Sequence, residues 1–264
     1  MGEVLGNQIR RASAMTRLQR IEEGLNDLLP DFDAEAPRRL AMYYEMLVDW
    51  NSRMNLTGDT DFDVVLDRHF WDSLAPLQQE ALFPKDITLA DVGSGAGFPG
   101  LPLAIVRQDL QVTLIDSLSK RIGFLNAVSK ELGLCNVKTI HARAEDAGRL
   151  PECREGFDRV TARAVAPLPV LCELLLPFAC VGGKVVAYKG PAAQEEEAAG
   201  NRVSVLLGGG KVSWIPVSIP NQPFWQHVVA VIEKKEKTAS QYPRKAGTIS
   251  RMPLGIPAKQ EGQA

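Results

Sequence analysis

The sequence predicts an α/β protein in which helices cover both faces of a doubly wound, mostly parallel sheet. Three observations lead to this prediction. From residue 84 onwards, short apolar strand-like segments alternate with amphipathic segments. A glycine-rich loop, residues 93–100, directly follows the first of these strands. Hydrophobic residues make up 45% of the 264 residues and charged residues 23%, a globular composition that excludes a disordered chain or a collagen-like repeat.

Residues 1–83 are predicted to form a helical N-terminal region. Residues 38–50 bring Leu40, Leu47 and Trp50 to one face at helical spacing, and residues 63–79 repeat this pattern. A stretch rich in turn and capping residues separates the two helices. His69 and Asp72 lie three residues apart in the second helix, where we interpret them as a structural pair. We expect the first 15 residues to be flexible.

Residues 84–236 are predicted to form the α/β domain. Its predicted strands are residues 87–91, 110–115, 137–140, 157–162, 184–189 and 227–232, and its predicted helices include residues 120–132 and 168–178. Gly182 and Gly183 predict a turn before the fifth strand. Ligands of such sheets bind at the carboxyl ends of the strands. Residues 237–264 remain as a basic C-terminal segment with a flexible end.

Several classes of protein are excluded by composition. No apolar run approaches the roughly 20 residues of a membrane span, and the N-terminus lacks the apolar core of a signal peptide, so we expect a cytoplasmic protein. The three histidines show no metal-ligand spacing, and no metal is expected. The cysteines form no C-x-x-C motif and are expected to be reduced thiols: Cys135, Cys153, Cys172 and Cys180.

Positive charge is concentrated at the two ends of the chain. Residues 1–20 carry a net charge of +3 and residues 234–259 a net charge of +6. Since the whole chain carries −2, the remaining residues together carry −11. Basic ends on an acidic body are compatible with a polyanion bound at one edge, and equally with solvated termini.

The glycine-rich loop fits two kinds of nucleotide site. Gly95, Gly97 and Gly100 match the dinucleotide fingerprint, in which a helix N-terminus faces a pyrophosphate. Asp91, Gly93, Gly95 and Gly97 instead match the first motif of S-adenosylmethionine-dependent methyltransferases. A carboxylate beside the loop repels a pyrophosphate but suits a sulfonium and an ammonium, so we expect Asp91 near the methionine end of that cofactor.

Two further positions support a nucleoside cofactor. Asp116 ends the second predicted strand, where a carboxylate accepts hydrogen bonds from ribose hydroxyls in both kinds of site. Ala144 and Glu145 follow the third strand, where methyltransferases contact the adenine. We therefore predict Gly93, Gly95 and Asp116 as cofactor-binding residues.

Longer segments resemble one family. The matching segments are WNSRMNLTG (50–58), RHFWDSL (68–74), DVGSGAGFPGLPLAIV (91–106), DSLSKRIGFL (116–125), RAED (143–146), TARAVAPL (161–168), YKG (188–190) and YPRKAGT (242–248). In this order they are similar to the glucose-inhibited division protein B family, also called RsmG. The resemblance implies a Rossmann-like class I methyltransferase fold with a mostly parallel seven-stranded sheet and an N-terminal helical cap.

The resemblance also implies an activity. Members of this family transfer a methyl group from S-adenosylmethionine to N7 of a guanosine in the 530 loop of bacterial 16S ribosomal RNA. Carried onto this chain, their cofactor contacts are Gly93, Phe98, Ala144, Glu145 and Arg163. Arg163 follows the fourth strand, where cofactor and target base must meet, so we assign it a catalytic positioning role.

N7 of guanine has a free lone pair and loses no proton on methylation, so we expect no general base. The proposed partner is 16S ribosomal RNA, as free RNA, in the 30S subunit or in an assembly intermediate, bound by a monomer. The candidate RNA-binding residues are Lys120, Arg121, Lys189, Tyr242, Arg244, Lys245 and Arg251. Arg251 stands near the position where the family carries a lysine.

Two alternatives remain open from the sequence. An NAD-dependent oxidoreductase would use the same loop and Asp116 for a dinucleotide. A non-catalytic RNA-binding module would keep the basic segments but have a decayed cofactor site, which the intact loop disfavours.

Overall fold

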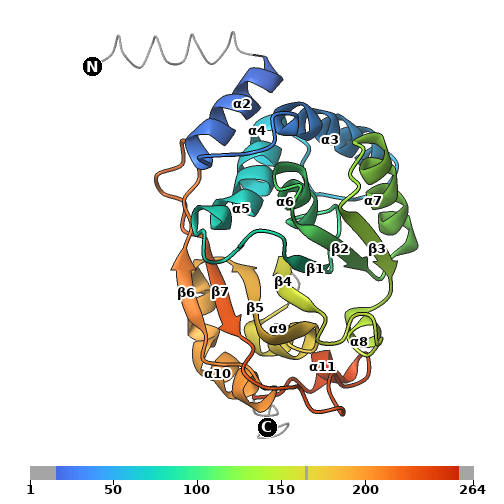
Figure 1. Ribbon diagram of the computed structural model, residues 1–264, viewed down its shortest axis with the longest axis vertical. Coiled ribbons are helices and arrows are strands. Elements are labelled where there is room, and N and C mark those ends of the chain that lie inside the picture. Colours follow the sequence, from blue (N-terminus) through green and yellow to red (C-terminus); the bar gives the residue numbers. More distant parts are fainter. Residues whose placement is uncertain (1–15, 164–165, 256–264) are drawn as a thin grey trace, which may run out of the picture.

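A seven-stranded sheet forms the centre of the molecule, in the order β3-β2-β1-β4-β5-β7-β6 (Figure 1). The computed structural model describes residues 16–163 and 166–255; the ends predicted to be flexible, 1–15 and 256–264, lie outside these ranges. The strands are β1 (Thr88–Val92), β2 (Gln111–Asp116), β3 (Val137–His141), β4 (Phe157–Arg163), β5 (Ala179–Lys189), β6 (Ser213–Pro216) and β7 (Val228–Glu233). β7 pairs antiparallel with β5 and β6, and the other four strand pairs of this sheet are parallel, which confirms the mostly parallel seven-stranded prediction.

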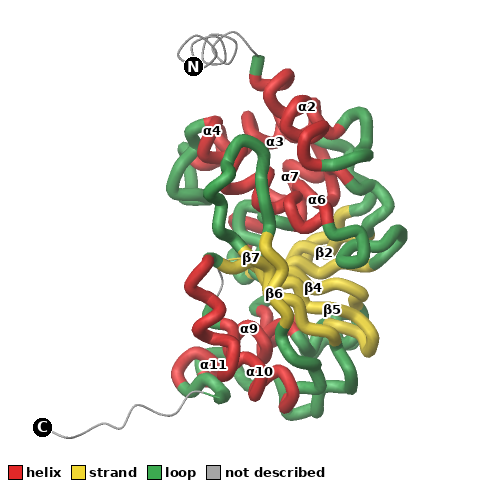
Figure 2. The backbone as a smooth tube through the Cα atoms, turned by 90° about the vertical axis from the view of Figure 1, so that its left-hand side faces the viewer, coloured by secondary structure: helices red, strands yellow, loops and turns green. Residues whose placement is uncertain are grey.

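Helices cover both faces of the sheet (Figure 2). One face carries α2 (Arg17–Leu28), α3 (Ala36–Asn51), α4 (Phe62–Val65), α6 (Gly100–Val106) and α7 (Ser119–Glu131). The other face carries α8 (Ala144–Ala147), α9 (Leu168–Leu175), α10 (Glu197–Leu206) and α11 (Thr248–Arg251). The 3-10 turn η3 (Pro191–Glu196) directly precedes α10. The helical N-terminal region therefore packs on the same face as α6 and α7.

Three elements differ from their sequence prediction. β5 begins at Ala179, five residues early, because the predicted turn at Gly182 is a bulge inside the strand, where the register against β4 shifts. α9 ends at Leu175, not residue 178, since Pro177 cannot continue a helix. β6 is a four-residue edge strand, and its SWIP sequence gave no usable strand signal.

The second predicted N-terminal helix is a continuous helical run of mixed geometry. It consists of α4, the π-helical turn η1 (Leu66–Trp71), α5 (Asp72–Leu74) and the 3-10 turn η2 (Ala75–Gln78). At the end of η1 the Asp72 N–H bonds the Asp67 carbonyl, five residues back. Such π-helical turns are rare and frequently occur at functional sites.

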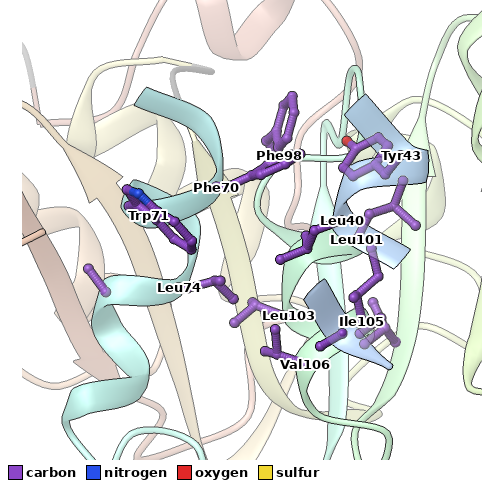
Figure 3. Close-up of a cluster of buried hydrophobic side chains, with 14 of the residues drawn as sticks. Leu40, Tyr43, Phe70, Trp71, Leu74, Phe98, Leu101, Leu103, Ile105 and Val106 are labelled. Carbon is purple, nitrogen blue, oxygen red and sulfur yellow. The ribbon is translucent and has the colours of Figure 1, made fainter. Parts of the chain in front are cut away.

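One hydrophobic core joins the N-terminal helices to the glycine-rich loop (Figure 3). The ring of Tyr43 in α3 lies 5.5 Å from the ring of Phe70 and 5.4 Å from that of Phe98, between ring centroids. The Tyr43 hydroxyl donates to the Ala96 carbonyl in the loop. The N-terminal region thus supports the loop directly, across the predicted boundary at residues 83/84, which stays a prediction.

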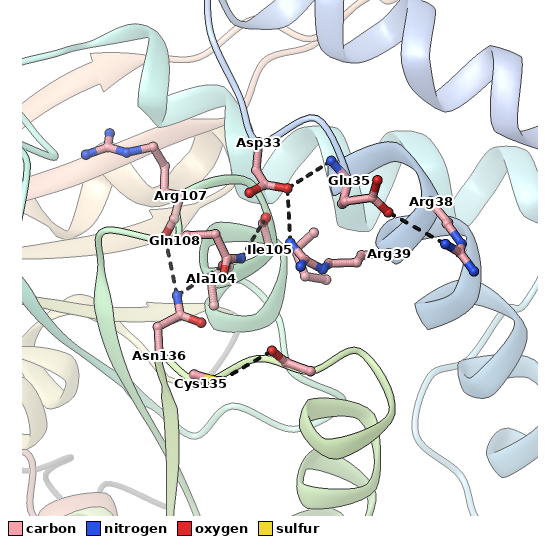
Figure 4. Close-up of polar contacts among 11 residues, drawn as sticks. Asp33, Glu35, Arg38, Arg39, Ala104, Ile105, Arg107, Gln108, Cys135 and Asn136 are labelled. Atoms are coloured by element: carbon pink, nitrogen blue, oxygen red, sulfur yellow. Dashed lines mark hydrogen bonds and ion pairs between the residues drawn. The ribbon is translucent and has the colours of Figure 1, made fainter.

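The C-terminal end of α6 is held by side-chain amides (Figure 4). The Gln108 amide donates to the carbonyls of Ala104 at 2.8 Å and Ile105 at 3.1 Å. The Asn136 amide, which precedes β3, donates to the Ala104 carbonyl at 3.2 Å. These bonds satisfy carbonyls that have no partner within a helix and fix α6 against the sheet.

Asp91 holds the other end of α6. Its carboxylate accepts from the Gly100 N–H at 3.1 Å and from the Thr161 hydroxyl in β4 at 2.9 Å. The side chain is fully buried and does not line the cavity beside the loop, so its expected place next to a cofactor is wrong. Burial raises the pKa of the Asp91 carboxyl to about 6.

We predict opposite effects for alanine at two helical glycines. A Cβ at Gly24 in α2 would lie 2.9 Å from Cε2 of Trp71 and closer still to Cζ2, whereas a Cβ at Gly123 in α7 meets no atom within 4 Å. Gly24→Ala should lower the free energy of unfolding, because overpacking costs about 1–3 kcal/mol against a helix-propensity gain of up to about 1 kcal/mol. Gly123→Ala should raise it by up to about 1 kcal/mol. Urea unfolding of both variants tests this, and a stabilised Gly24→Ala would contradict the packing argument.

A pH dependence follows from Asp91. Its pKa is higher in the folded protein than the 3.8 of a free carboxyl, so the folded state binds the proton more tightly. This contribution to stability is present below about pH 4 and is lost as the pH rises through about 6, by up to about 3 kcal/mol. Urea unfolding across this range should show that loss in the wild type relative to Asp91→Asn, which has no titrating group. Parallel pH profiles for the two proteins would refute the prediction.

Candidate functional site

The loop between β1 and α6 adopts conformations that require glycine. Gly93, Gly95 and Gly97 have φ angles of 77°, 58° and 103°. The N–H groups of Gly93 and Ser94 donate to the carbonyl of Ile115 in β2, at 2.8 and 3.1 Å. The loop is therefore fastened to the end of the neighbouring strand.

Asp116 lies at the carboxyl end of β2 and holds the glycine-rich loop by a hydrogen bond. Its Oδ2 accepts from the Gly95 N–H at 2.9 Å, and its Oδ1 accepts from the Leu118 N–H at 2.9 Å. Nη1 of Arg121 lies 3.4 Å from Oδ2. Each carboxylate oxygen has further acceptor capacity, so a bound hydroxyl can share this group.

A cavity of 490 Å³ opens beside this loop, within the size range of small-molecule sites. All seven residues predicted to bind the cofactor line it: Gly93, Gly95, Phe98, Asp116, Ala144, Glu145 and Arg163. A Cβ added at Gly95 would meet no atom closer than 3.9 Å, so that position faces open space. The cavity is thus lined by glycine backbone on the β1–α6 loop and by the Asp116 carboxylate at the end of β2. This combination suits a nucleoside, whose ribose hydroxyls can donate to the carboxylate.

Arg163, the last residue of β4, is held at three points. Its Nη1 donates to the Arg68 carbonyl at 2.8 Å and to Oδ2 of Asp72 at 3.2 Å. Its Nη2 donates to Nδ1 of His69 at 3.0 Å. The guanidinium carbon also lies 5.0 Å from the centroid of the Phe98 ring. The π-helical turn and α5 therefore fix this cation in one orientation.

His69 is a neutral acceptor toward Arg163. A guanidinium has only donors, so Nδ1 of His69 must accept, and Nε2–H then donates to the Thr57 hydroxyl at 3.0 Å. Burial, and then the charge of Arg163, lower the pKa of His69 to about 4. The imidazole also stacks on Phe98, at 4.6 Å between centroids. Both ring nitrogens are thereby engaged.

A second pocket of 350 Å³ also adjoins Arg163. Its walls are Arg68, His69, Asp72, Arg163, Ala166, Tyr188, Lys189, Gly190 and His227. Arg163 and His69 line both pockets, so they form a shared wall. Asp72 lines the second pocket only and connects its walls, because its Oδ1 lies 2.8 Å from Nδ1 of His227 and its Oδ2 contacts Arg163.

Sequence reasoning missed four of these residues. Thr57, His69, Asp72 and His227 complete the hydrogen-bonded chain that runs through Arg163. His69 and Asp72, interpreted as a structural pair, have Arg163 as their common partner. The segments NLTG and RHFWD carried a usable signal, since both belong to the stretches that resemble the family.

The candidate RNA-binding residues occupy different environments. Arg121 lines the large cavity, and Lys120 beside it is exposed. Lys245 and Arg251 are exposed on the C-terminal segment. Lys189 instead lines the second pocket.

Two residues of the C-terminal segment are engaged within the protein. Tyr242 is only 9% exposed and packs in the core between the sheet and α9. Arg244 makes a two-pronged ion pair with the fully buried carboxylate of Glu173 in α9, at 2.9 Å from Nε and 2.7 Å from Nη2. Both residues anchor the segment beside Leu174, which lines the large cavity.

Within residues 16–163 and 166–255, no three histidine, cysteine or acidic side chains come together as metal ligands. Over the same ranges, no helix has the length and apolar character needed to cross a membrane.

Comparison with known proteins identifies the family. The sequence profile of the GidB family, described as rRNA small subunit methyltransferase G, matches residues 37–223. Two relatives are named Ribosomal RNA small subunit methyltransferase G. The protein from Lactococcus lactis is 42% identical and the match covers 86% of this chain and 96% of the relative. The protein from Streptococcus pyogenes is 45% identical and the match covers 80% of this chain and 89% of the relative. A T. thermophilus 16S rRNA N2 methyltransferase structure aligns with 65% of this chain and 41% of its own, at 16% identity and TM-score 0.45, too distant to bear on function. The chain belongs to the rRNA small subunit methyltransferase G family, which confirms the family, enzyme class and S-adenosylmethionine dependence predicted from its sequence.

Proposed function

We propose that this protein transfers a methyl group from S-adenosylmethionine to N7 of a guanosine in the 530 loop of bacterial 16S ribosomal RNA. The observation that carries the proposal is the pair of pockets that share Arg163 and His69 as a wall. Two reactants, one in each pocket, would meet at that wall. Positioning of this kind is the main source of catalysis when no proton has to be moved.

The cofactor fits the larger cavity. Asp116 would accept from the ribose hydroxyls, as its position at the end of β2 favours. Ala144 and Glu145 would border the adenine, and Gly93 and Gly95 the methionine part. These five residues lie at or just after the carboxyl ends of β1, β2 and β3.

The chemistry needs an aligned nucleophile and no base. When bound, S-adenosylmethionine presents a methyl group on a sulfonium: the N7 lone pair forms the N–C bond, the C–S bond breaks, and its electron pair stays on sulfur. His69 is unsuited to act as a base, since both its nitrogens are engaged by Arg163 and Thr57. Asp72 is equally committed, to Arg163 and His227. Arg163 would orient the reactants at the shared wall.

The RNA surface in this proposal consists of cations at or next to the large cavity and on the C-terminal segment. They are Lys120, Arg121, Lys245 and Arg251. Tyr242 and Arg244 would act indirectly, by fixing the C-terminal segment. We propose that the protein acts as a cytoplasmic monomer on 16S RNA, whether free, in the 30S subunit or in an assembly intermediate.

The function is tested by locating the transferred methyl. Labelled S-adenosylmethionine and 16S RNA are incubated with the protein, and the label is mapped by mass spectrometry. Guanosine N7 should carry it, and RNA with 7-deazaguanosine at the target should remain unlabelled. NAD should give no calorimetric binding signal, which separates this proposal from an oxidoreductase.

We predict that Gly95→Val weakens cofactor binding. Gly95 and Gly133 have similar positive φ angles, 58° and 65°, and at neither would a Cβ meet an atom closer than 3.9 Å. Both valine variants should therefore lose similar stability through backbone strain, on the order of 1–3 kcal/mol. Only Gly95 lines the cavity, so only Gly95→Val should lower S-adenosylmethionine affinity, by at least about tenfold in calorimetry. Equal affinities for the two variants would remove Gly95 from the cofactor site.

We also predict that exposed cations set the salt dependence of RNA binding. The double variant Lys245→Ala, Arg251→Ala should flatten the slope of log affinity against log salt by up to about 1.4, since each phosphate contact on single-stranded RNA contributes roughly 0.7. Arg244 is left intact because its loss would strand the buried Glu173. Cofactor affinity should not change. Lys138→Ala, Lys211→Ala, exposed lysines that lie outside the C-terminal segment, are the control; a slope equally reduced in the control would contradict the assignment.

A further inference from the structure

Lys189 is a cation held inside a pocket. It is the last residue of β5, and its side chain is only 12% exposed. Its Nζ donates to the Ala166 carbonyl at 3.2 Å and to Oε2 of Glu196 at 3.0 Å. An ammonium has three N–H donors, so among the described residues one donor is left for a ligand of the second pocket.

This placement does not suit a contact with the RNA backbone. A phosphate-binding lysine is typically exposed and free to follow the strand, as Lys245 is. Lys189 is largely covered, is paired with a carboxylate, and lines a pocket of 350 Å³. Its environment suits a hydrogen bond to one atom of a ligand in that pocket.

Guanine presents a matching pattern. N7 and O6 are neighbouring acceptors on the same edge of the base. Arg163 and Lys189 both line the second pocket and are donors, so a base bound there with N7 directed at the shared wall can present O6 to one of them. Adenine has an amino group at that position, which would set donor against donor and leave the remaining N–H of Lys189 without an acceptor.

We propose that the second pocket holds the flipped target guanine and that Lys189 donates a hydrogen bond to its O6. The inference rests on the proposed function for the reaction at N7. It adds the binding site of the base and assigns Lys189 as the residue that selects guanine. Lys189 thereby becomes a specificity-determining residue instead of a phosphate contact.

The test pairs a side-chain deletion with a deletion of the base atom. RNAs carrying either guanosine or 2-aminopurine, which retains N7 but lacks O6, are methylated by the wild type and by Lys189→Met. On guanosine RNA, Lys189→Met should lose about 10- to 100-fold in kcat/KM, the range for a hydrogen bond to a charged group. On 2-aminopurine RNA, the two proteins should differ by less than about threefold. The intrinsic reactivity of each base cancels in these ratios.

Lys245→Met is the matched control, because this exposed lysine should lower kcat/KM on both RNAs by the same factor. Thermal unfolding and calorimetry with S-adenosylmethionine verify that Lys189→Met is folded; if it is not, Lys189→Gln replaces it, with the same comparison of ratios. An equal loss on both RNAs would overturn the assignment of Lys189 to O6. Failure of the proposed function looks different, since the wild type would then leave N7 of the guanosine RNA unmethylated.

Discussion

The site depends on the immobilisation of one guanidinium. Arg163 emerges from the central strand β4, and its partners come from the helical run that precedes the sheet in sequence: the Arg68 carbonyl, His69 and Asp72. Without them a long cation between two pockets would be mobile, and ordering it at the moment of reaction would cost conformational entropy. The contact explains why the N-terminal helices are built into the same core as the glycine-rich loop, through Tyr43 and Phe98.

The helical run of η1 and α5 supplies both side-chain and backbone partners for this contact. His69 and Asp72, three residues apart, present their side chains to one guanidinium, as residues at this spacing do on one helix face, and the Arg68 carbonyl adds a backbone acceptor. At the end of the turn, the Asp72 N–H reaches back to Asp67, while the Arg68 carbonyl accepts from Arg163. A local departure from regular helix geometry is thus matched to a partner more than 90 residues away.

The sequence predicted the scaffold better than the wall of the site. Strands such as Thr88–Val92 and the glycine positions follow from local pattern and turn chemistry, and the seven predicted cofactor residues meet at one cavity because parallel strands end at the same edge. The chain through Thr57, His69 and His227 depends on contacts across long sequence separations, which no local pattern encodes. The basic character of the C-terminal segment also led to Tyr242 and Arg244 being predicted as RNA contacts. In the structure Tyr242 lies in the core, and Arg244 forms an ion pair with the buried Glu173.

The electrostatics of the shared wall suit a reaction that moves a charge without moving a proton. In the proposed reaction, methylation of N7 would move one positive charge from the sulfonium in the larger cavity to the base in the second pocket. Arg163 stays protonated at any physiological pH, and His69, with its pKa lowered to about 4, stays neutral. Burial and the neighbouring cation thus prevent His69 from titrating near pH 7, where a free imidazole would. Neither Arg163 nor His69 therefore changes its charge with small shifts in pH near 7.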